Sequence, residues 1–167
     1  MAVAAKISVE EYLNTSYRPD CDYVDGEVQE RNLGQQSHGR LQFAIAAWFS
    51  GRERQFRCRV LPEVRLQVRR DRFRIPDIML IPPEAADEEI VKTPPLLCIE
   101  IMSPGDTLAR IRRRAGDYFA MGVPTCWIID SNSGQAWTAT PSSLTEATDG
   151  ILRAGAIAMP LSEVLES

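Results

Sequence analysis

The stretch "PPLLCIEIMSPGD", residues 94–106, decides how the rest of the sequence is interpreted. Its segment from Leu96 to Met102 is apolar enough to form a buried strand, and Glu100 lies inside that segment. Burying a carboxylate costs several kcal/mol unless a partner compensates the charge. The sequence therefore predicts a central strand that carries a paired acidic side chain, and the identity of the partner becomes the main question.

The bulk composition is that of a globular protein. The chain has 167 residues, of which 44% are hydrophobic and 25% charged, and its net charge is −4. These values predict one domain over residues 1–167 with its own core. No apolar run approaches the roughly 20 residues of a membrane span, and the start "MAVAAKIS" lacks the apolar segment of a secretory signal. We expect a cytoplasmic protein with no membrane partner.

The four cysteines support the same expectation. They are far apart in the sequence and form no Cys-x-x-Cys pair, and two of them lie in apolar, strand-like runs. This pattern favours buried reduced thiols over disulfides or a zinc site. The residues concerned are Cys21, Cys58, Cys98 and Cys126.

Arginine is distributed unevenly along the chain. Seventeen of the 19 cationic residues are arginine, and nine of these lie between Arg52 and Arg74. The acidic net charge excludes a globally basic surface of the kind that binds nucleic acid. The clusters favour a solvated face, with phosphate contacts as the alternative. A second cluster consists of Arg110, Arg112, Arg113 and Arg114.

Turn and capping residues predict the elements of the first third of the chain. "ISVEEYLN" (7–14) is predicted to be a short helix with Ser8 as its N-cap. "YVDGEVQER" (23–31) is predicted to be strand, turn and strand around its Asp-Gly pair. A longer helix is predicted from Ser37, as N-cap, to about Ser50, and its inner face would hold His38 beside the apolar residues. These are Leu41, Ala44, Ile45, Trp48 and Phe49.

The remaining elements alternate between strands and helices. "RVLPEVRLQV" (59–68) and "FRIPDIMLI" (73–81) are predicted to form a hairpin joined by the basic turn "RRDR" (69–72). A helix is predicted from Asp106, as N-cap, to Gly122. The strands "PTCWIID" (124–130) and "QAWTAT" (135–140) and a short helix in 161–167 complete the chain. The predicted class is α/β (α+β), a mixed sheet with helices packed against it.

A second carboxylate, Asp77, follows Pro76 inside the apolar run 75–81. Proline lacks an N–H group, so we expect an edge or a bend there, where a carboxylate can face a cavity. Two carboxylates on neighbouring strands repel unless a positive group lies between them. Mg²⁺ would satisfy Asp77 and Glu100, and a buried ion pair with an arginine is the alternative. Arg112 and Arg114 lie at the borders of the apolar face of the helix 107–121, from where an arginine can reach over the core toward Glu100.

At this point the ordered motifs resemble the Uma-type restriction endonuclease family of the PD-(D/E)XK nuclease superfamily. The resemblance runs from about Ile7 to Asp130 and implies a restriction-endonuclease-like mixed central β-sheet flanked by helices, usually in a homodimer. It also implies an endonuclease that depends on Mg²⁺ or Mn²⁺ and hydrolyses phosphodiester bonds in DNA. The matching pieces are "SVEEYL", "YVDGEV", a helix that opens with His38, "IPDIMLI", "PPLLCIEIMSPGD" and "RRRAGDYFAMGVPTCWIID".

The resemblance assigns roles to individual residues of this sequence. Asp77 and Glu100 match the two acidic metal ligands, and the carbonyl of Ile101 would be a third ligand. We expect the two carboxylates to lie roughly 4–6 Å apart, with a metal ion between them. Glu27, in the "DGE" turn, matches a possible further acid, with a plain turn residue as the alternative. His38 matches a histidine near the site, with a hydrogen-bonded histidine at the core edge as the alternative.

Two departures from the family pattern concern the catalytic lysine. Met102 occupies the position two residues after the acidic ligand, where the superfamily has lysine. The Uma-type family commonly moves the lysine onto the next helix, four residues before the tyrosine, which here is Arg114. Arginine can neutralise the scissile phosphate but cannot serve as a base. The alternatives are therefore an active nuclease and a catalytically impaired module that binds nucleic acid or a protein partner.

Overall fold

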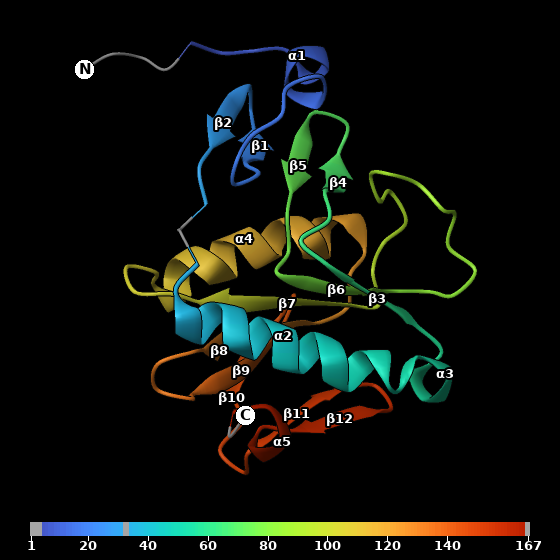
Figure 1. Cartoon of the computed structure of the whole chain (residues 1–167), viewed down its shortest axis with the longest axis vertical. Helices are drawn as coiled ribbons and strands as arrows, with labels where there is room; N and C mark the ends of the chain where they lie inside the picture. The colour runs from blue at the N-terminus through green and yellow to red at the C-terminus, as the bar shows by residue number, and fades with distance from the viewer. Residues whose placement is uncertain (1–4, 32–33, 166–167) are drawn as a thin grey trace.

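The computed structural model describes residues 5–31 and 34–165, and its centre is the strand predicted from residues 94–106. This strand, β7 (Leu97–Met102), pairs in parallel with β8 (Cys126–Asp130) and antiparallel with β6 (Ile78–Ile81). The six-stranded sheet has the order β10-β9-β8-β7-β6-β3. Its mixed pairing, with helices on both sides, confirms the predicted fold class (Figure 1).

The remaining strands of the sheet lie on either side of this centre. β3 (Arg59–Pro62) pairs with β6 at one edge, while β9 (Ala136–Thr140) and β10 (Ser143–Glu146) extend the sheet beyond β8. Parallel neighbours need a crossover connection, and the helix α4 (Leu108–Met121) supplies it between β7 and β8. Glu100 and α4 are therefore separated by only a short loop.

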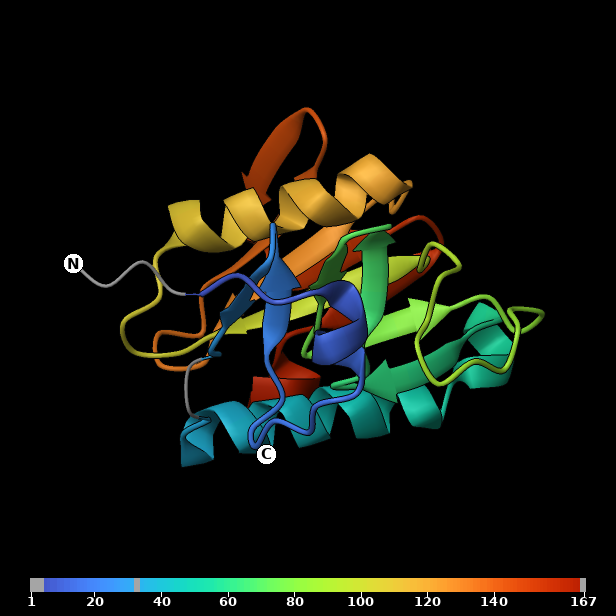
Figure 2. The same ribbon diagram turned by 90° about the horizontal axis from the view of Figure 1, so that it is seen from above.

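Two helices cover opposite faces of the central sheet, as Figure 2 shows. α2 (Gln36–Ser50) packs against Leu97, Ile99 and Ile101 of β7, whereas α4 packs on the side of Cys98 and Met102. Successive residues of a strand point to opposite faces. This alternation directs the side chain of Glu100 toward α4.

The C-terminal part of the chain closes the core on the α2 side. β11 (Ile151–Ala154) and β12 (Ile157–Pro160) form a hairpin, and α5 (Ser162–Leu165) follows it. Their side chains join the same apolar cluster as α2. None of the helices in the described residues is long and apolar enough to cross a membrane.

A separate small sheet stands over α4 at one end of the molecule (Figure 1). Its order is β2-β1-β5-β4, and a cluster of aromatic rings, in which Tyr12 stacks on Tyr23 and contacts Phe73, fixes it together with α1. This sheet brings residues that are distant in sequence close to the central strand. Its elements are α1 (Val9–Leu13), β1 (Asp22–Val24), β2 (Glu27–Gln29), β4 (Leu66–Arg69) and β5 (Arg72–Arg74).

The hairpin predicted over residues 59–81 is correct only in its middle. β4 and β5 pair around the basic turn, but β3 and β6 belong to the central sheet. Two breaks divide the predicted strands: Glu63 adopts a positive φ of 50°, and the chain bends at Asp77 after Pro76. The bend at Asp77 was expected from the missing proline N–H group.

Two predicted helix caps were wrong. The N-cap of α4 is Thr107, whose hydroxyl accepts from the Arg110 amide at 3.2 Å, while Asp106 accepts from the amide of Ser103 at 3.0 Å. α2 begins at Gln36 without a side-chain cap, so Ser37 lies within its first turn. A short polar side chain has several backbone donors within reach, and sequence alone does not choose among them.

Other local predictions were confirmed. Ser8 caps α1 by accepting from the Glu11 amide, and all four cysteines are free and buried. The closing helix ends at Leu165, and the last two residues predicted for it lie outside the described part of the chain. The prediction omitted the short helix α3 (Glu53–Phe56) and the strands β10, β11 and β12.

Candidate active site

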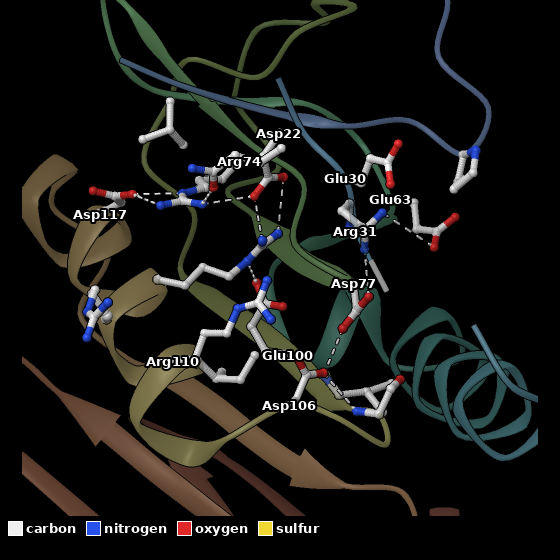
Figure 3. Close-up of a pocket in the computed structure, with 18 of the residues that line it drawn as sticks. Asp22, Glu30, Arg31, Glu63, Arg74, Asp77, Glu100, Asp106, Arg110 and Asp117 are labelled. Carbon is white, nitrogen blue, oxygen red and sulfur yellow. Dashed lines mark hydrogen bonds and ion pairs between the residues drawn. The ribbon is translucent and has the colours of Figure 1, made fainter. Parts of the chain in front are cut away.

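A pocket of about 740 Å³ lies between α4, the small sheet and the start of α2 (Figure 3). Its lining is dominated by charged side chains of both signs. The acidic residues are Asp22, Asp25, Glu30, Glu63, Asp77, Glu100, Asp106 and Asp117. The arginines are Arg31, Arg72, Arg74, Arg110, Arg113 and Arg114, and His38 and Ile101 also line the pocket.

Asp77 and Glu100 reach one pocket from neighbouring strands of the central sheet. Ile78 of β6 pairs with Ile99 of β7; Asp77 directly precedes Ile78, at the bend before β6, and Glu100 directly follows Ile99. Both residues line the pocket, where they are only 3% and 4% exposed, and Figure 3 shows them together. They form the floor of the pocket.

Asp77 is held by donors from three elements. Its Oδ1 accepts from Arg31 at 2.8 Å and lies 3.3 Å from His38 Nε2, and its Oδ2 accepts from the Ile101 amide at 2.7 Å. The Gln42 side chain donates to its backbone carbonyl at 3.0 Å, which fixes the bend. These contacts fix the orientation of the Asp77 carboxylate.

Burial and these donors act in opposite directions on the pKa values of the pair. Burial alone would raise the pKa of Asp77, but the hydrogen bond to His38 and the charges of Arg31 and His38 outweigh it and lower this pKa. Burial would lower the pKa of His38, but Asp77 outweighs it, so the pKa of His38 is raised. The lowered pKa of Asp77 and the raised pKa of His38 thus share one cause, the contact between the carboxylate and the imidazole.

Glu100 obtains its compensation from α4. Its Oε1 accepts from Arg114 Nε at 2.9 Å and from the hydroxyl of Tyr118. Burial still raises the pKa of Glu100, and the nearby charge of Asp77 adds to the effect, although Arg114 and Tyr118 oppose it. Arg114 and Tyr118 are thus the partners that the buried carboxylate requires.

Arg114 is in turn held from the small sheet. Both terminal nitrogens of its guanidinium donate to the carboxylate of Asp22, and one also donates to the Ile75 carbonyl at 2.8 Å. Asp22 is 1% exposed. All three guanidinium nitrogens of Arg114 are therefore engaged within the protein, which is the pairing that the sequence left open as the alternative to a phosphate contact.

A ladder of alternating charges continues from Asp22 across the small sheet. Arg74 forms two ion pairs, one with Asp22 at 3.0 Å and one with Asp117 of α4 at 2.7 Å, and Figure 3 draws both. Arg72 likewise forms an ion pair with Asp117 at 2.7 Å and another with Asp25 at 2.7 Å. Two arginines of the cluster between Arg52 and Arg74 therefore do not belong to a solvated face but bind carboxylates.

Asp22 and Asp117 were missed by the sequence analysis. One signal was present: Arg72 and Arg74 flank the apolar Phe73 and so share one face of a strand, which requires acids opposite them. A second signal was the position of Asp117, three residues after Arg114 on the same helix. Neither signal identifies Asp22, which reaches the site only because β1 pairs with β5.

The structure brings five of the six predicted site residues to the pocket. Asp77, Glu100, Ile101, His38 and Arg114 line it, whereas Glu27 is not among the lining residues. Glu27 pairs with Val24 next to the β1–β2 turn. This position agrees with the alternative of a plain turn residue.

The donor set at the floor of the pocket fits a hard divalent cation. The described residues contain no cluster of three or more His, Cys, Asp or Glu placed to hold a metal ion. Mg²⁺ needs fewer protein ligands, because one or two carboxylates suffice when water fills the remaining positions. The hydrogen bonds that Glu100 accepts from Arg114 and Tyr118 both use Oε1, so within the described chain Oε2 keeps its lone pairs for such an ion.

A mixed central sheet flanked by helices, with two buried acids in one pocket beside its central strands, is typical of the restriction-endonuclease-like class of α/β proteins. The sequence model of the Uma2 family, described as "Putative restriction endonuclease", matches residues 9–155, and the chain belongs to this family. A solved structure of a "putative nuclease" from Anabaena variabilis has the same fold, with a TM-score of 0.82 at 18% identity, covering 96% of this chain and 98% of that one. No curated protein matches the sequence.

The first prediction concerns proton binding in metal-free protein. We expect Glu100 to titrate above the ordinary glutamate pKa of about 4.3 and Asp77 below the ordinary aspartate pKa of about 3.9. Since folded Glu100 retains its proton longer than in the unfolded chain, its contribution to stability falls as the pH rises through its raised pKa. The contribution of Asp77 to stability has the opposite pH dependence: it is lost as the pH falls below the pKa that Asp77 has in the unfolded chain.

Carboxyl carbon NMR, assigned with the Asp77→Asn and Glu100→Gln variants, measures both pKa values directly. A Glu100 that titrates below its ordinary value would contradict the burial of its carboxylate beside Asp77.

The second prediction tests the pairing of Arg114. Arg114→Ala leaves Asp22 and Glu100 buried without their shared cation, so we expect the free energy of unfolding to fall by about 3–5 kcal/mol. Arg114→Lys keeps the charge but loses the forked hydrogen bonds, so we expect a smaller loss of stability. Urea unfolding followed by circular dichroism measures both changes.

The exposed Arg112 of the same helix provides the matched control, because Arg112→Ala removes a guanidinium that does not line the pocket. An Arg114→Ala protein as stable as this control, together with increased cleavage in Arg114→Lys, would instead make Arg114 a degenerate catalytic lysine.

Proposed function

We propose that the protein is a metal-dependent endonuclease that hydrolyses phosphodiester bonds in DNA. One observation carries the proposal: Asp77, at the bend before β6, and Glu100, in the adjacent strand β7, are both buried acids that line the same charged pocket. Membership of the restriction endonuclease family supports the same activity. The absence of a membrane-crossing helix in the described residues agrees with action in the cytoplasm, which is part of the proposal.

Asp77, Glu100 and the carbonyl of Ile101 would hold Mg²⁺ or Mn²⁺. Such an ion supplies a water molecule of lowered pKa and neutralises charge on the phosphate. The surrounding residues keep the ligands in place: His38 and Arg31 orient Asp77, and Arg114 orients Glu100. Arg114 also puts a fixed positive charge on the wall of the pocket, close to where the scissile phosphate would lie.

A second candidate function is a catalytically impaired module that binds nucleic acid or a protein partner. The observation in its favour is that the described residues lining the pocket include no lysine, and Arg114 has carboxylate partners instead. Without a lysine, proton transfer depends on other groups of the site. The two candidates differ in one measurable property, which is turnover.

The third prediction is that purified protein cleaves DNA in the presence of Mg²⁺ or Mn²⁺ and not in EDTA. Supercoiled plasmid and circular single-stranded DNA should both be offered, so that the result does not depend on strandedness. We expect Asp77→Asn and Glu100→Gln to abolish cleavage and Mn²⁺ binding measured by calorimetry. We expect His38→Ala to weaken Mn²⁺ binding about 10–100-fold, because His38 orients a metal ligand.

Glu89→Gln is the matched control, since Glu89 is exposed and does not line the pocket. Its activity and Mn²⁺ affinity should equal those of the wild type. Metal binding without cleavage of either DNA would favour the impaired module, and wild-type cleavage by Asp77→Asn would overturn the proposed site.

The fourth prediction concerns assembly, for which we propose a homodimer. The family resemblance suggests it, and β3 and β10 are edge strands with unpaired backbone groups. Phe43 on α2 is 75% exposed, which is unusual for a large apolar side chain in a monomer. Sedimentation velocity at micromolar concentration should give the mass of a dimer, and a single monomeric species would refute this proposal.

A further inference from the structure

Two arginines of the pocket differ from the other four. Arg31, Arg72, Arg74 and Arg114 each have a carboxylate partner within 3.0 Å. Arg110 and Arg113 line the same pocket and are exposed, and neither guanidinium has an ion pair or hydrogen bond with the described residues. The unpaired positive charge of the pocket is therefore confined to the wall formed by α4.

Arg110 and Arg113 lie near the N-terminus of α4. Arg110 is in the first turn, which contains no acidic residue, and Arg113 is in the second turn, while Asp106 precedes the N-cap. The positive end of the helix dipole is unfavourable for a cation in the first turn. A bound phosphate would offset both their mutual repulsion and the dipole.

The opposite wall of the pocket carries exposed acids. Asp25, Glu30 and Glu63 are exposed residues of the small sheet and of the neighbouring loops, and they line the pocket. Asp25 is partly neutralised by Arg72, and Glu63 lies 3.7 Å from Arg31. Phosphates that approached along this wall would meet carboxylates at close range.

The charges of the two walls favour a single DNA strand over a duplex. A duplex carries phosphates on both of its strands, so that one strand on α4 would bring the other toward the acidic wall. Asp77 and Glu100 are only 3% and 4% exposed, so a scissile phosphate must descend to the floor of the pocket. A single strand is flexible enough for one phosphate to reach the two buried acids while the neighbouring phosphates remain in contact with α4.

We propose that Arg110 and Arg113 form a phosphate track for single-stranded DNA, which leads the strand across α4 to Asp77 and Glu100. This inference rests on the proposed nuclease function and specifies its substrate. The described lining contains no Phe, Tyr or Trp on which bases could stack, so contact is with the backbone and tolerates any sequence.

The test is binding of a fluorescein-labelled 20-mer, single-stranded or as a duplex, to the full-length protein in Ca²⁺, followed by fluorescence anisotropy over a range of salt concentrations. The single strand should bind more tightly than the duplex. Each lost phosphate contact lowers the slope of log K against log salt by about 0.7 for a single strand. For the Arg110→Gln/Arg113→Gln protein the magnitude of the slope should therefore fall by about 1.4. If this variant and the wild type bind equally at 1 M salt, the variant should bind about 25-fold more weakly at 0.1 M salt.

Arg112→Gln, with Arg153→Gln added to match the change of two charges, is the control. Both of its arginines lie outside the pocket lining, so its salt slope should equal that of the wild type. Equal melting temperatures of the two double variants exclude misfolding as a cause.

Three outcomes overturn the phosphate track: a duplex that binds as tightly as the single strand, equal salt slopes for the two double variants, or no binding of either DNA. In the first two cases the protein could still cleave plasmid in a metal-dependent way, and the Asp77→Asn variant could still lose that cleavage. The substrate inference therefore fails separately from the nuclease function. Absence of both binding and cleavage would overturn both.

Discussion

The structure depends on the compensation of one buried carboxylate, that of Glu100 in the central strand. Arg114 reaches it from α4, and Asp22 holds the other side of the same guanidinium from the small sheet. A buried ion pair with a partner removed is strongly unfavourable, whereas a fully hydrogen-bonded one is tolerated. The three parts of the fold that meet at Arg114 are therefore fixed relative to one another by charge as well as by apolar packing.

This arrangement also divides the arginines of the pocket by function. Those that neutralise carboxylates hold the site together, and all three guanidinium nitrogens of Arg114 already donate to groups of the protein. The pocket nevertheless keeps unpaired positive charge on α4, at its rim. Arg114 thus has a structural role, whereas Arg110 and Arg113 of the same run of four arginines carry the ligand-binding role that we propose.

Local sequence patterns predicted the central strand, the helices that cover it and the position of Asp77 at a bend. They succeeded where a strong apolar period or a proline restricts the backbone, as in residues 97–102 and at Pro76. They failed where tertiary pairing decides. The segment 59–81 divides between two sheets, and nothing local in it shows which strand each half will join.

The same distinction applies to the candidate site. Asp77, Glu100 and Arg114 could be selected because each is a charged residue in or beside an apolar run. Asp22 could not, because its role arises from the pairing of β1 with β5, fifty residues later in the chain. Whether an arginine is paired or available likewise depends on carboxylates contributed by other elements, which a single sequence does not place.

The central claim is that Asp77 and Glu100 act together on one divalent ion. A crystal structure of the protein soaked in Mn²⁺, with anomalous diffraction data, tests it most directly. We expect one strong anomalous peak between the two carboxylates, with their oxygen atoms roughly 4–6 Å apart or closer and within coordinating distance of the peak. Carboxylates that remain bound only to Arg31, His38 and Arg114, with no peak between them at saturating Mn²⁺, would contradict the account.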